Sequence, residues 1–465
     1  MTTVAKPAQP LQALWSAANL SSTALERLQL SGLDPALPSS FALGSAAQAA
    51  IAAAALAATE VGRLRNGVVQ GVAVDMRAAV LECSGFFTID GRVPDKWDKL
   101  SGLYRCRQGW VRIHANFAHH RDGALRLLGL PPGPDIERAA VEAALIKRDA
   151  FAFEDAAAEA GLVVAAARSF DQWDAHGQAE ALARQPLLTW EKIGDAPPHA
   201  LPALASDARP LSGMRVLDLT RILAGPVCGR TLAAYGADVM LVNSPHLPNI
   251  ESIIETSRGK LSCHLDLATA AGRDGLRSLL TDAHVLVQGY RPGALEALGF
   301  GPQDAARVRP GVVYVSLSAY GHAGPWAARR GFDSLVQTAT GFNHAEMLAA
   351  GETRPKPMPV QILDYASGFL MAFAAQAALL RQAREGGSWH VRVSLARTGL
   401  WLRSLGRVTD GFSSAMPAPE DSLESSTSGW GELRAVRHAA TLSHTPVEWQ
   451  RASVRPGTHA PVWPA

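Results

Sequence analysis

The sequence predicts an α/β protein, with a doubly wound, mostly parallel sheet and a second, smaller α+β domain. Short apolar segments alternate with helical segments between residues 214 and 318. Glycine or proline separates most of these segments, as Gly236 and Gly299 do. Strands that alternate with helices at this spacing are typical of a parallel sheet, because each helix returns the chain to the edge where the next strand starts.

The elements of this sheet follow one another in order. We expect strands over residues 214–219, 237–242, 283–287 and 312–318, and helices over residues 227–235, 272–280 and 293–298. Gly236 and Gly299 each follow a helix at the position where glycine commonly ends one. A helical segment (369–384) and a strand segment (390–394) continue the pattern, which favours a Rossmann-like arrangement.

The first 210 residues are less regular. We expect an Ala-rich helix over residues 41–64, a strand over 68–74, a hairpin over 101–116 and several helices between 122 and 190. The expected division of the chain is an N-terminal helix and strand segment (1–95), the smaller domain (96–195), a linker (196–210), the Rossmann-like domain (211–405) and a tail that returns over the fold (406–465).

The composition excludes several classes of protein. The 465 residues are 48% hydrophobic and 18% charged, as in globular proteins, and a net charge of +2 without a run of Lys or Arg argues against nucleic-acid binding. Four scattered cysteines predict reduced thiols in a cytoplasmic protein. We expect no signal peptide and no membrane span, because Ser45 and Gln48 interrupt the Ala-rich residues 41–58, which favours a buried helix.

Three histidines, His114, His119 and His120, lie close together in the sequence. Histidine is a common metal ligand, but no carboxylate or cysteine stands at motif spacing from these three. We therefore interpret them as the end of a strand and the turn that follows it, and expect no metal site.

Asp364 is the residue on which the functional interpretation depends. Residues 360–363 predict a short strand, and an Ala/Leu-rich helix is expected to follow from Phe369. One interpretation is that the carboxylate at this junction is simply a helix cap, since it can accept hydrogen bonds from the backbone amides of the first turn. The alternative is that the carboxylate is chemically active.

An internal similarity bears on the same residue. Ser40-Phe-Ala-Leu-Gly44, with the helix and strand that follow it, parallels Asp364-Tyr-Ala-Ser-Gly368, its helix and its strand. If both copies fold alike, only the second carries a carboxylate, since Ser40 stands where the other copy has Asp364. The similarity could equally reflect only the shared Ala-rich composition.

Three cations stand near the expected ends of strands. Arg258 and Lys260 flank a glycine before one strand, and Arg291 follows another strand beside an aromatic ring. Taken singly, each could be a solvated surface charge, but together they suggest a phosphorylated ligand, because ligands bind at the carboxyl ends of parallel strands. The motif GxGxxG is absent from the loop after the first strand, so an ordinary dinucleotide site is not supported.

A series of short motifs gives the chain a resemblance to a known family. In order they are 211–221 (LSGMRVLDLTR), 223–226 (LAGP), 235–239 (YGADV), 258–260 (RGK), 264–267 (HLDL), 290–293 (YRPG), 318–321 (SAYG), 332–337 (FDSLVQ) and 363–368 (LDYASG). In order and spacing they resemble the class III CoA-transferase family, the CaiB/BaiF group. The chain departs from the family pattern at Asn243, where the family has an acidic residue, and in its order of segments.

The resemblance implies a function and a set of site residues. Asp364 would be the nucleophile that moves coenzyme A from an acyl-CoA thioester to a carboxylic acid through an aspartyl anhydride and an aspartyl-CoA thioester. We expect an exposed, ionised carboxylate that needs no separate base. The residues expected to bind coenzyme A are Leu223, Arg258, Lys260, Tyr290, Arg291, Arg330 and Phe332. The resemblance also implies a homodimer.

Two other functions are compatible with the same motifs. The fold also hosts α-methylacyl-CoA racemases, which pair the Asp with a His in a Gly-His-Asp segment. Here that segment is Gly331-Phe332-Asp333, and phenylalanine cannot exchange a proton, so transfer is favoured over racemisation. The third possibility is a non-catalytic CoA-binding protein, because a fold does not determine a function.

Overall fold

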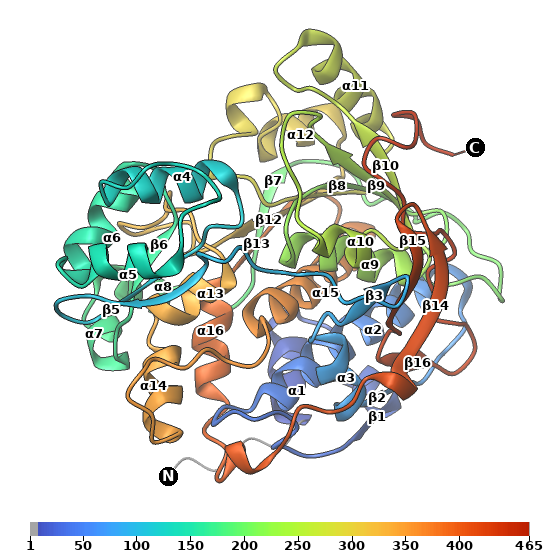
Figure 1. Ribbon diagram of the computed structural model, residues 1–465. Coiled ribbons are helices and arrows are strands. Elements are labelled where there is room, and N and C mark those ends of the chain that lie inside the picture. Colours follow the sequence, from blue (N-terminus) through green and yellow to red (C-terminus); the bar gives the residue numbers. More distant parts are fainter. Residues whose placement is uncertain (1–7, 465) are drawn as a thin grey trace.

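A computed structural model describes residues 8–464 of the chain (Figure 1). Its centre is a seven-stranded sheet in the order β10-β9-β8-β11-β12-β13-β7. The strands are β7 (Thr189–Gly194), β8 (Arg215–Leu219), β9 (Asp238–Asn243), β10 (Lys260–His264), β11 (Val285–Gln288), β12 (Val313–Ser318) and β13 (Ser388–Ser394). All neighbouring pairs are parallel except β13 with β7 at one edge. The protein is thus a mixed α/β fold with a large, mostly parallel sheet.

Helices cover both faces of this sheet because its strands are apolar on both sides. Apart from Val242, the valines of β8, β9, β11, β12 and β13 lie in the main core with α9 (Ala224–Ala234) and α15 (Ile362–Glu385). The alternate residues of the strands face α11 (Ala270–Thr281) and α12 (Pro302–Val308) in a second core. Strands that are buried on both faces are the expected feature of parallel sheets.

The Ala-rich helix α2 (Leu43–Asn66) lies against α15 in the centre of the molecule. Both helices are long and apolar enough to cross a membrane, and the most apolar 18 residues of each are wholly buried inside the protein. Small side chains let the two helices approach closely, and burial in the core explains their apolar character. The buried helix expected over residues 41–64 is therefore present.

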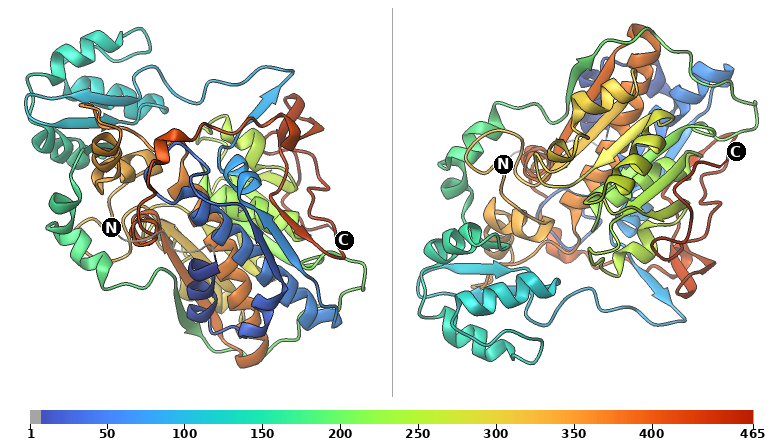
Figure 2. Two further views of the ribbon diagram at one scale, coloured as in Figure 1. Left: turned by 90° about the horizontal axis from the view of Figure 1, so that it is seen from below. Right: turned by 90° about the horizontal axis from the view of Figure 1, so that it is seen from above.

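A smaller group of elements lies to one side of the large sheet (Figure 2). A three-stranded sheet of β4 (Gly102–Arg105), β5 (Trp110–Ile113) and β6 (Val164–Ala166) packs there with its own apolar core. The helices of this region are α4 (Ala118–Leu127), α5 (Arg138–Leu145), α6 (Ala150–Glu159), α7 (Phe170–Asp174) and α8 (Gly177–Ala183). The chain leaves this region through β7, which belongs to the large sheet although its residues were expected to be part of the smaller domain.

Strands from the N-terminal and C-terminal parts of the described chain pair with each other beside the large sheet (Figure 1). The C-terminal strands β14 (Leu423–Ser428) and β15 (Gly431–Val436) form a sheet with β3 (Phe87–Ile89), and β16 (Ala440–Leu442) pairs with β2 (Val72–Asp75), which pairs with β1 (Leu28–Ser31). The remaining helices are α1 (Ala8–Ala17), α3 (Met76–Glu82), α10 (Ser252–Thr256), α13 (Asp333–Ala339), α14 (Phe342–Ala349) and α16 (Leu395–Ser404).

One helix–strand–helix unit occurs twice, but the two copies align at residues other than the expected pair of Ser40 and Asp364. Helices α2 and α15 have 24 residues each, and both are followed by a strand whose last residue caps the next helix. Aligning the two helix starts places Ser45 opposite Asp364 as the third residue. The backbone N–H of Ser45 donates to Oδ2 of Asp34 at 2.9 Å. Ser40, the expected counterpart, lies before the helix and bonds Glu346 instead.

Candidate active site

Asp364 lies in the first turn of α15, and its side chain lines two cavities that meet there. The strand expected over residues 360–363 is absent, because the helix already begins at Ile362. The preceding run of prolines at 355, 357 and 359 disfavours both a helix and a paired strand. Asp364 therefore points from inside a helix and is not its N-cap, a position that Gln361 holds.

A second carboxylate, that of Asp333, holds the start of α15. The backbone N–H of Asp364 donates to Oδ2 of Asp333 at 2.9 Å, and the side-chain amide of Gln337 donates to Oδ1 at 2.5 Å. Burial raises the pKa of Asp333 to about 6, although these hydrogen bonds oppose the rise. Asp333 is thus the carboxylate of the pair that protein donors satisfy.

The carboxyl group of Asp364 is in a different position. Its residue is only 8% exposed, and no hydrogen-bond donor among the described residues reaches its side chain. Burial, and then the negative charge of Asp333, raise the pKa of Asp364 well above its ordinary value. The expectation of an exposed, freely ionised carboxylate is therefore wrong. The group is buried at the cavity wall and holds its proton more tightly.

The larger cavity, of about 360 Å³, lies at the carboxyl ends of the central strands. Its walls come from the segments that follow β8, β11 and β12, and from the smaller domain at Phe117 and His119. The strand order reverses between β8 and β11, which is where ligands bind in open parallel sheets. Five of the predicted binding residues line this cavity: Leu223, Tyr290, Arg291, Arg330 and Phe332.

The larger cavity is positively charged. Arg221, Arg291 and Arg330 line it, and none of them forms an ion pair with a carboxylate of the described residues. Partial burial and the charge of Arg291 lower the pKa of Arg330, because like charges that face one space repel. Unneutralised arginines of this kind suit a phosphate or carboxylate group.

The backbone beside Asp364 is strained. Ile222 has a φ of 78°, which is unfavourable for a β-branched residue, and it lines both cavities. It lies in the turn from β8 into α9, where Leu223 is the N-cap. The first amides of α9 have no partner within their own helix, and Ala224, the first residue of that helix, lines the larger cavity. Strain of this sort is concentrated at functional sites.

The smaller cavity, of about 240 Å³, lies on the other side of Ile222, Leu223 and Phe332. Aromatic residues Phe87, Trp97 and Tyr365 line it together with polar groups. These two cavities share the wall that carries the Asp364 side chain. A molecule in each could therefore reach the same carboxyl group.

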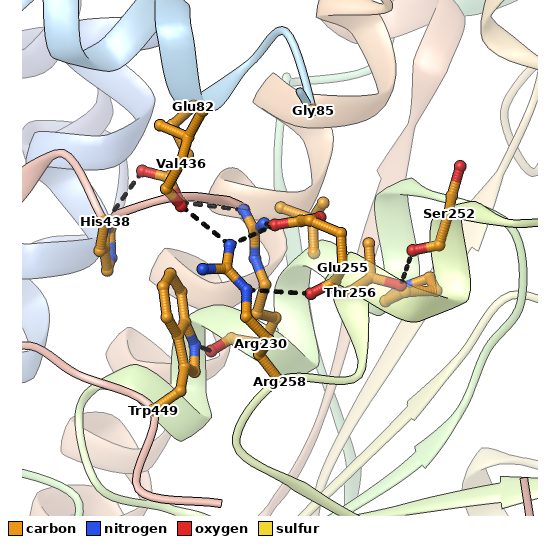
Figure 3. A network of polar contacts seen from close by, with 12 residues as sticks. Glu82, Gly85, Arg230, Ser252, Glu255, Thr256, Arg258, Val436, His438 and Trp449 are labelled. Atoms are coloured by element: carbon orange, nitrogen blue, oxygen red, sulfur yellow. Dashed lines mark hydrogen bonds and ion pairs between the residues drawn. The ribbon is translucent and has the colours of Figure 1, made fainter. Parts of the chain in front are cut away.

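Two of the predicted binding residues lie outside both cavities. Arg258 is 3% exposed, pairs with Glu255 at 2.5 Å and Glu424 at 3.0 Å, and stacks on Trp449 (Figure 3). Lys260 is 1% exposed and its Nζ lies 2.8 Å from Oδ2 of Asp218. Their positions correct the expectation that they hold phosphates, because the charge of each is already neutralised inside the core.

Arg258 belongs to a network that joins distant segments (Figure 3). Arg230 of α9 pairs with Glu82 at 2.9 Å and also with Glu255, and Glu82 accepts from the N–H of Ala439 at 2.8 Å. The network ties α3, α9, α10 and the C-terminal segment together beneath the smaller cavity, which Glu255 also lines. Its role in this structure is to hold that wall in place.

The three clustered histidines surround the site. His114 stacks on Phe332 with ring centroids 4.0 Å apart, and burial lowers the pKa of His114 to about 3. His119 and His120 line the larger cavity, where His120 Nε2 lies 3.3 Å from Arg330. Across residues 8–464 no group of three or more His, Cys, Asp or Glu side chains is placed to hold a metal ion.

The sequence interpretation missed Arg221, His119 and His120 as cavity residues. Arg221 stands in the loop after the first strand of the sheet, so its position at a strand end was an available signal. The histidines come from the smaller domain, and nothing local in the sequence indicates that this domain faces the large sheet. Asp333 was noted only as a neighbour of Phe332.

Residues 211–429 match the model of CoA-transferase family III. The chain is 35% identical over 228 residues to an acetyl-coenzyme A transferase of Hypoxylon pulicicidum, covering 48% of this chain and 37% of the relative. It is 33% identical over 232 residues to a probable fatty acyl-CoA transferase of Mycobacterium tuberculosis, and the match covers 46% of this chain and 58% of the relative. A succinate–glutarate CoA-transferase of Agrobacterium fabrum is 33% identical over 207 residues, and the match covers 40% of this chain and 51% of the relative.

The similarity is partial in length. The matched segments span about half the length of these curated relatives, and less of the Hypoxylon protein. A crystal structure of the Mycobacterium tuberculosis relative matches at 35% identity and a TM-score of 0.40. The match covers 43% of this chain and 57% of the chain in that structure.

Proposed function

Because residues 211–429 match the model of CoA-transferase family III, we propose that this chain moves coenzyme A from an acyl-CoA thioester to a carboxylic acid. The single observation that carries the proposal is the position of Asp364 at the wall shared by two cavities. One cavity is positively charged and suits the phosphates of coenzyme A. The other is smaller and partly aromatic, and it suits the acyl group.

The reaction we propose is a series of acyl exchanges at Asp364. Its carboxylate oxygen attacks the thioester carbonyl and forms a new C–O bond. The C–S bond then breaks, so that coenzyme A leaves as a thiolate and the acyl group remains on Asp364 as an acyl-aspartyl anhydride. The thiolate then attacks the aspartyl carbonyl, which releases the first acid and leaves an aspartyl-CoA thioester. The acceptor carboxylate repeats these two steps in reverse and regenerates Asp364. Covalent catalysis divides one difficult exchange into easier steps.

Asp333 and α9 would support these steps. Asp333 holds the start of α15, so Asp364 cannot rotate away with a frayed helix end. Its negative charge raises the pKa of Asp364, which makes the ionised group a more basic nucleophile. The free amides in the first turn of α9, beside Leu223 and Ala224, are donors suited to a developing oxyanion.

The coenzyme would bind where Rossmann-like sheets bind their ligands, in the crevice at the reversal of strand order. Arg221, Arg291 and Arg330 are the cations offered to its phosphates, and Tyr290 is an aromatic ring beside them. The names of the relatives point to acetyl, fatty acyl and succinyl or glutaryl groups, so they do not single out an acyl group for this chain.

One observation favours a second candidate, an isomerase that exchanges the α-proton of an acyl-CoA. His114 lines the smaller cavity together with Asp364. Its ring stacks on Phe332, the residue that stands where the racemases have the histidine of their Gly-His-Asp segment. The pKa of about 3 makes His114 a weak base, which disfavours proton abstraction. Deuterium uptake at the α-carbon without transfer to an added acid would support this candidate instead.

The test of transfer is an adduct at Asp364. Incubation with an acyl-CoA, followed by hydroxylamine trapping and peptide mass spectrometry, should modify Asp364 in the wild type. Asp364→Asn should lose the adduct and reduce turnover by at least about 10³-fold. The control is Asp207→Asn, an exposed carboxylate outside both cavities, which should behave as wild type. Full activity of Asp364→Asn would contradict the proposal.

A homodimer and a cytoplasmic location remain predictions. Sedimentation of the purified chain tests the first, and fractionation of the producing cells tests the second.

A further inference from the structure

The smaller cavity has one cation in its lining. Of the charged residues that line it, Glu255 is engaged by Arg230 and Arg258, and Asp364 is the reactive group. The third is Lys96, which comes from the segment that leads from β3 into the smaller domain. A lysine at the wall of an acyl cavity is unexpected, because an apolar acyl chain offers nothing to an ammonium group.

Lys96 is held in place by backbone contacts. Its Nζ donates to the carbonyl oxygen of Gly85 at 2.6 Å and lies 5.7 Å from the centre of the Phe87 ring. The side-chain amide of Asn116 donates to the carbonyl of Lys96 at 2.8 Å, which fixes the backbone at this point. The position of the ammonium group is therefore a built feature of the cavity wall.

The charge of Lys96 is not neutralised by the protein. No carboxylate of the described residues forms an ion pair with it, and burial lowers the pKa of its ammonium group. An ammonium has three N–H donors, and the carbonyl of Gly85 uses one of them. Two donors therefore remain for another acceptor, and a carboxylate is the acceptor that would also offset the cost of burying the charge.

A second polar group in the same cavity also lacks a partner. Ser334 is 1% exposed, and its Oγ has no hydrogen-bond partner among the described residues. It lines the cavity from the first turn of α13, next to Asp333. A purely hydrocarbon acyl chain would leave this hydroxyl without a hydrogen-bond partner and the Lys96 ammonium without a counter-charge, which favours a substrate with polar ends.

We propose that the acid handled in the smaller cavity is a dicarboxylic acid, or its half-thioester, whose second carboxylate binds Lys96. The reacting carboxyl group then lies at the Asp364 end of the cavity and the free carboxylate at the Lys96 end. Monocarboxylic acids of the same length are discriminated against, because they leave the half-buried ammonium without a counter-charge. The assignment of the reacting end rests on the proposed function, whereas binding of the free carboxylate does not.

The first test measures binding without turnover. Calorimetric titration should show that the wild type binds succinate and glutarate at least about tenfold more tightly than butyrate and pentanoate. Lys96→Met should weaken binding of the two diacids by about 10- to 100-fold and leave the monoacids unchanged. Lys96→Arg should retain most of the preference, because it keeps the charge. The control is Lys99→Met, which removes a half-exposed lysine paired with Glu137.

The second test measures transfer. With succinyl-CoA and butyryl-CoA as donors, Lys96→Met should raise KM for the first and leave kcat and the second donor nearly unchanged. Equal binding of diacids and monoacids by the wild type, or an equal effect of Lys96→Met on both, would overturn the inference. If Asp364 forms an adduct but Lys96→Met shows no selectivity, only the inference fails. If diacids bind through Lys96 but no adduct forms, the proposed function fails instead.

Discussion

The backbone N–H of Asp364 donates to Oδ2 of Asp333 at 2.9 Å, so the start of the long central helix is anchored by the carboxylate next to the candidate nucleophile. Asp333 collects the hydrogen bonds, and Asp364 is left facing two cavities with a raised pKa. This division of roles between two neighbouring carboxyl groups leads to the first two predictions.

The rate of transfer should rise with pH through the raised pKa of Asp364, because only the ionised group is a nucleophile. Asp333→Asn removes the negative charge that helps to raise this pKa, so the rising limb of kcat/KM should move to lower pH. The measurement is kcat/KM for an acyl-CoA between pH 5 and 9 at constant ionic strength. Asp207→Asn should leave the profile in place, and an unmoved limb in Asp333→Asn would contradict the coupling.

Asp364→Asn should stabilise the fold at neutral pH. The folded protein binds the Asp364 proton more tightly than the unfolded chain does, so this group lowers stability as pH rises from about 4, the ordinary carboxyl pKa, through its raised folded pKa. Replacing it by a neutral amide should raise the free energy of unfolding by about 1–3 kcal/mol at pH 7–8. Denaturant titrations should show that this gain shrinks toward zero near pH 4.

Arg291→Gln should weaken the binding of acyl-CoA without unfolding the protein. Arg291 is exposed at the larger cavity and has no carboxylate partner among the described residues. Under the proposed function, its loss removes one contact with a phosphate of coenzyme A. We expect KM for acyl-CoA to rise about tenfold, with a smaller difference at high salt. Initial rates at two ionic strengths measure this. Arg105→Gln, at an exposed position of β4, should leave KM unchanged.

In contrast to Arg291→Gln, Arg258→Met should lower the stability of the protein. The change leaves the buried Glu255 with one fewer cation and removes the contacts of Arg258 with Glu424 and Val436. Breaking a buried pair from one side costs about 3–5 kcal/mol, which unfolding in urea would measure. Normal stability of Arg258→Met together with a raised KM for acyl-CoA would contradict this prediction and would indicate that Arg258 binds coenzyme A.

Gly368→Ala should push α15 away from α9. A Cβ at this position would lie 2.5 Å from the carbonyl oxygen of Ala224 and 2.7 Å from Val227. Overpacking of this kind costs about 1–3 kcal/mol, and it should lower kcat because Asp364 is one turn away on the same helix. Thermal unfolding and turnover measure the two effects. Gly177→Ala is the control, since its nearest neighbour would be an ordinary contact at 3.7 Å.

The large sheet could be predicted from the sequence because its signals are local. The strands expected over residues 214–219, 237–242, 283–287 and 312–318 are mostly apolar segments, and a glycine such as Gly236 or Gly299 ends the helix before or after them. The edge strands β7 and β10 were not among these expected strands, and β10 carries the polar residues Lys260 and Ser262. The order of short motifs around Asp364 likewise indicated the family and the residue that would carry the chemistry. These inferences need only the neighbours of each residue along the chain.

Tertiary structure decided what depends on partners that are distant in the sequence. Arg258 and Arg291 are the same residue type near strand ends, but Glu255 and Glu424 bury the first while the second faces a cavity. Asp364 has a raised pKa because the fold places Asp333 and the protein interior against it. The charge of a side chain is written in the sequence, whereas its solvation and its counter-charge exist only once the chain has folded.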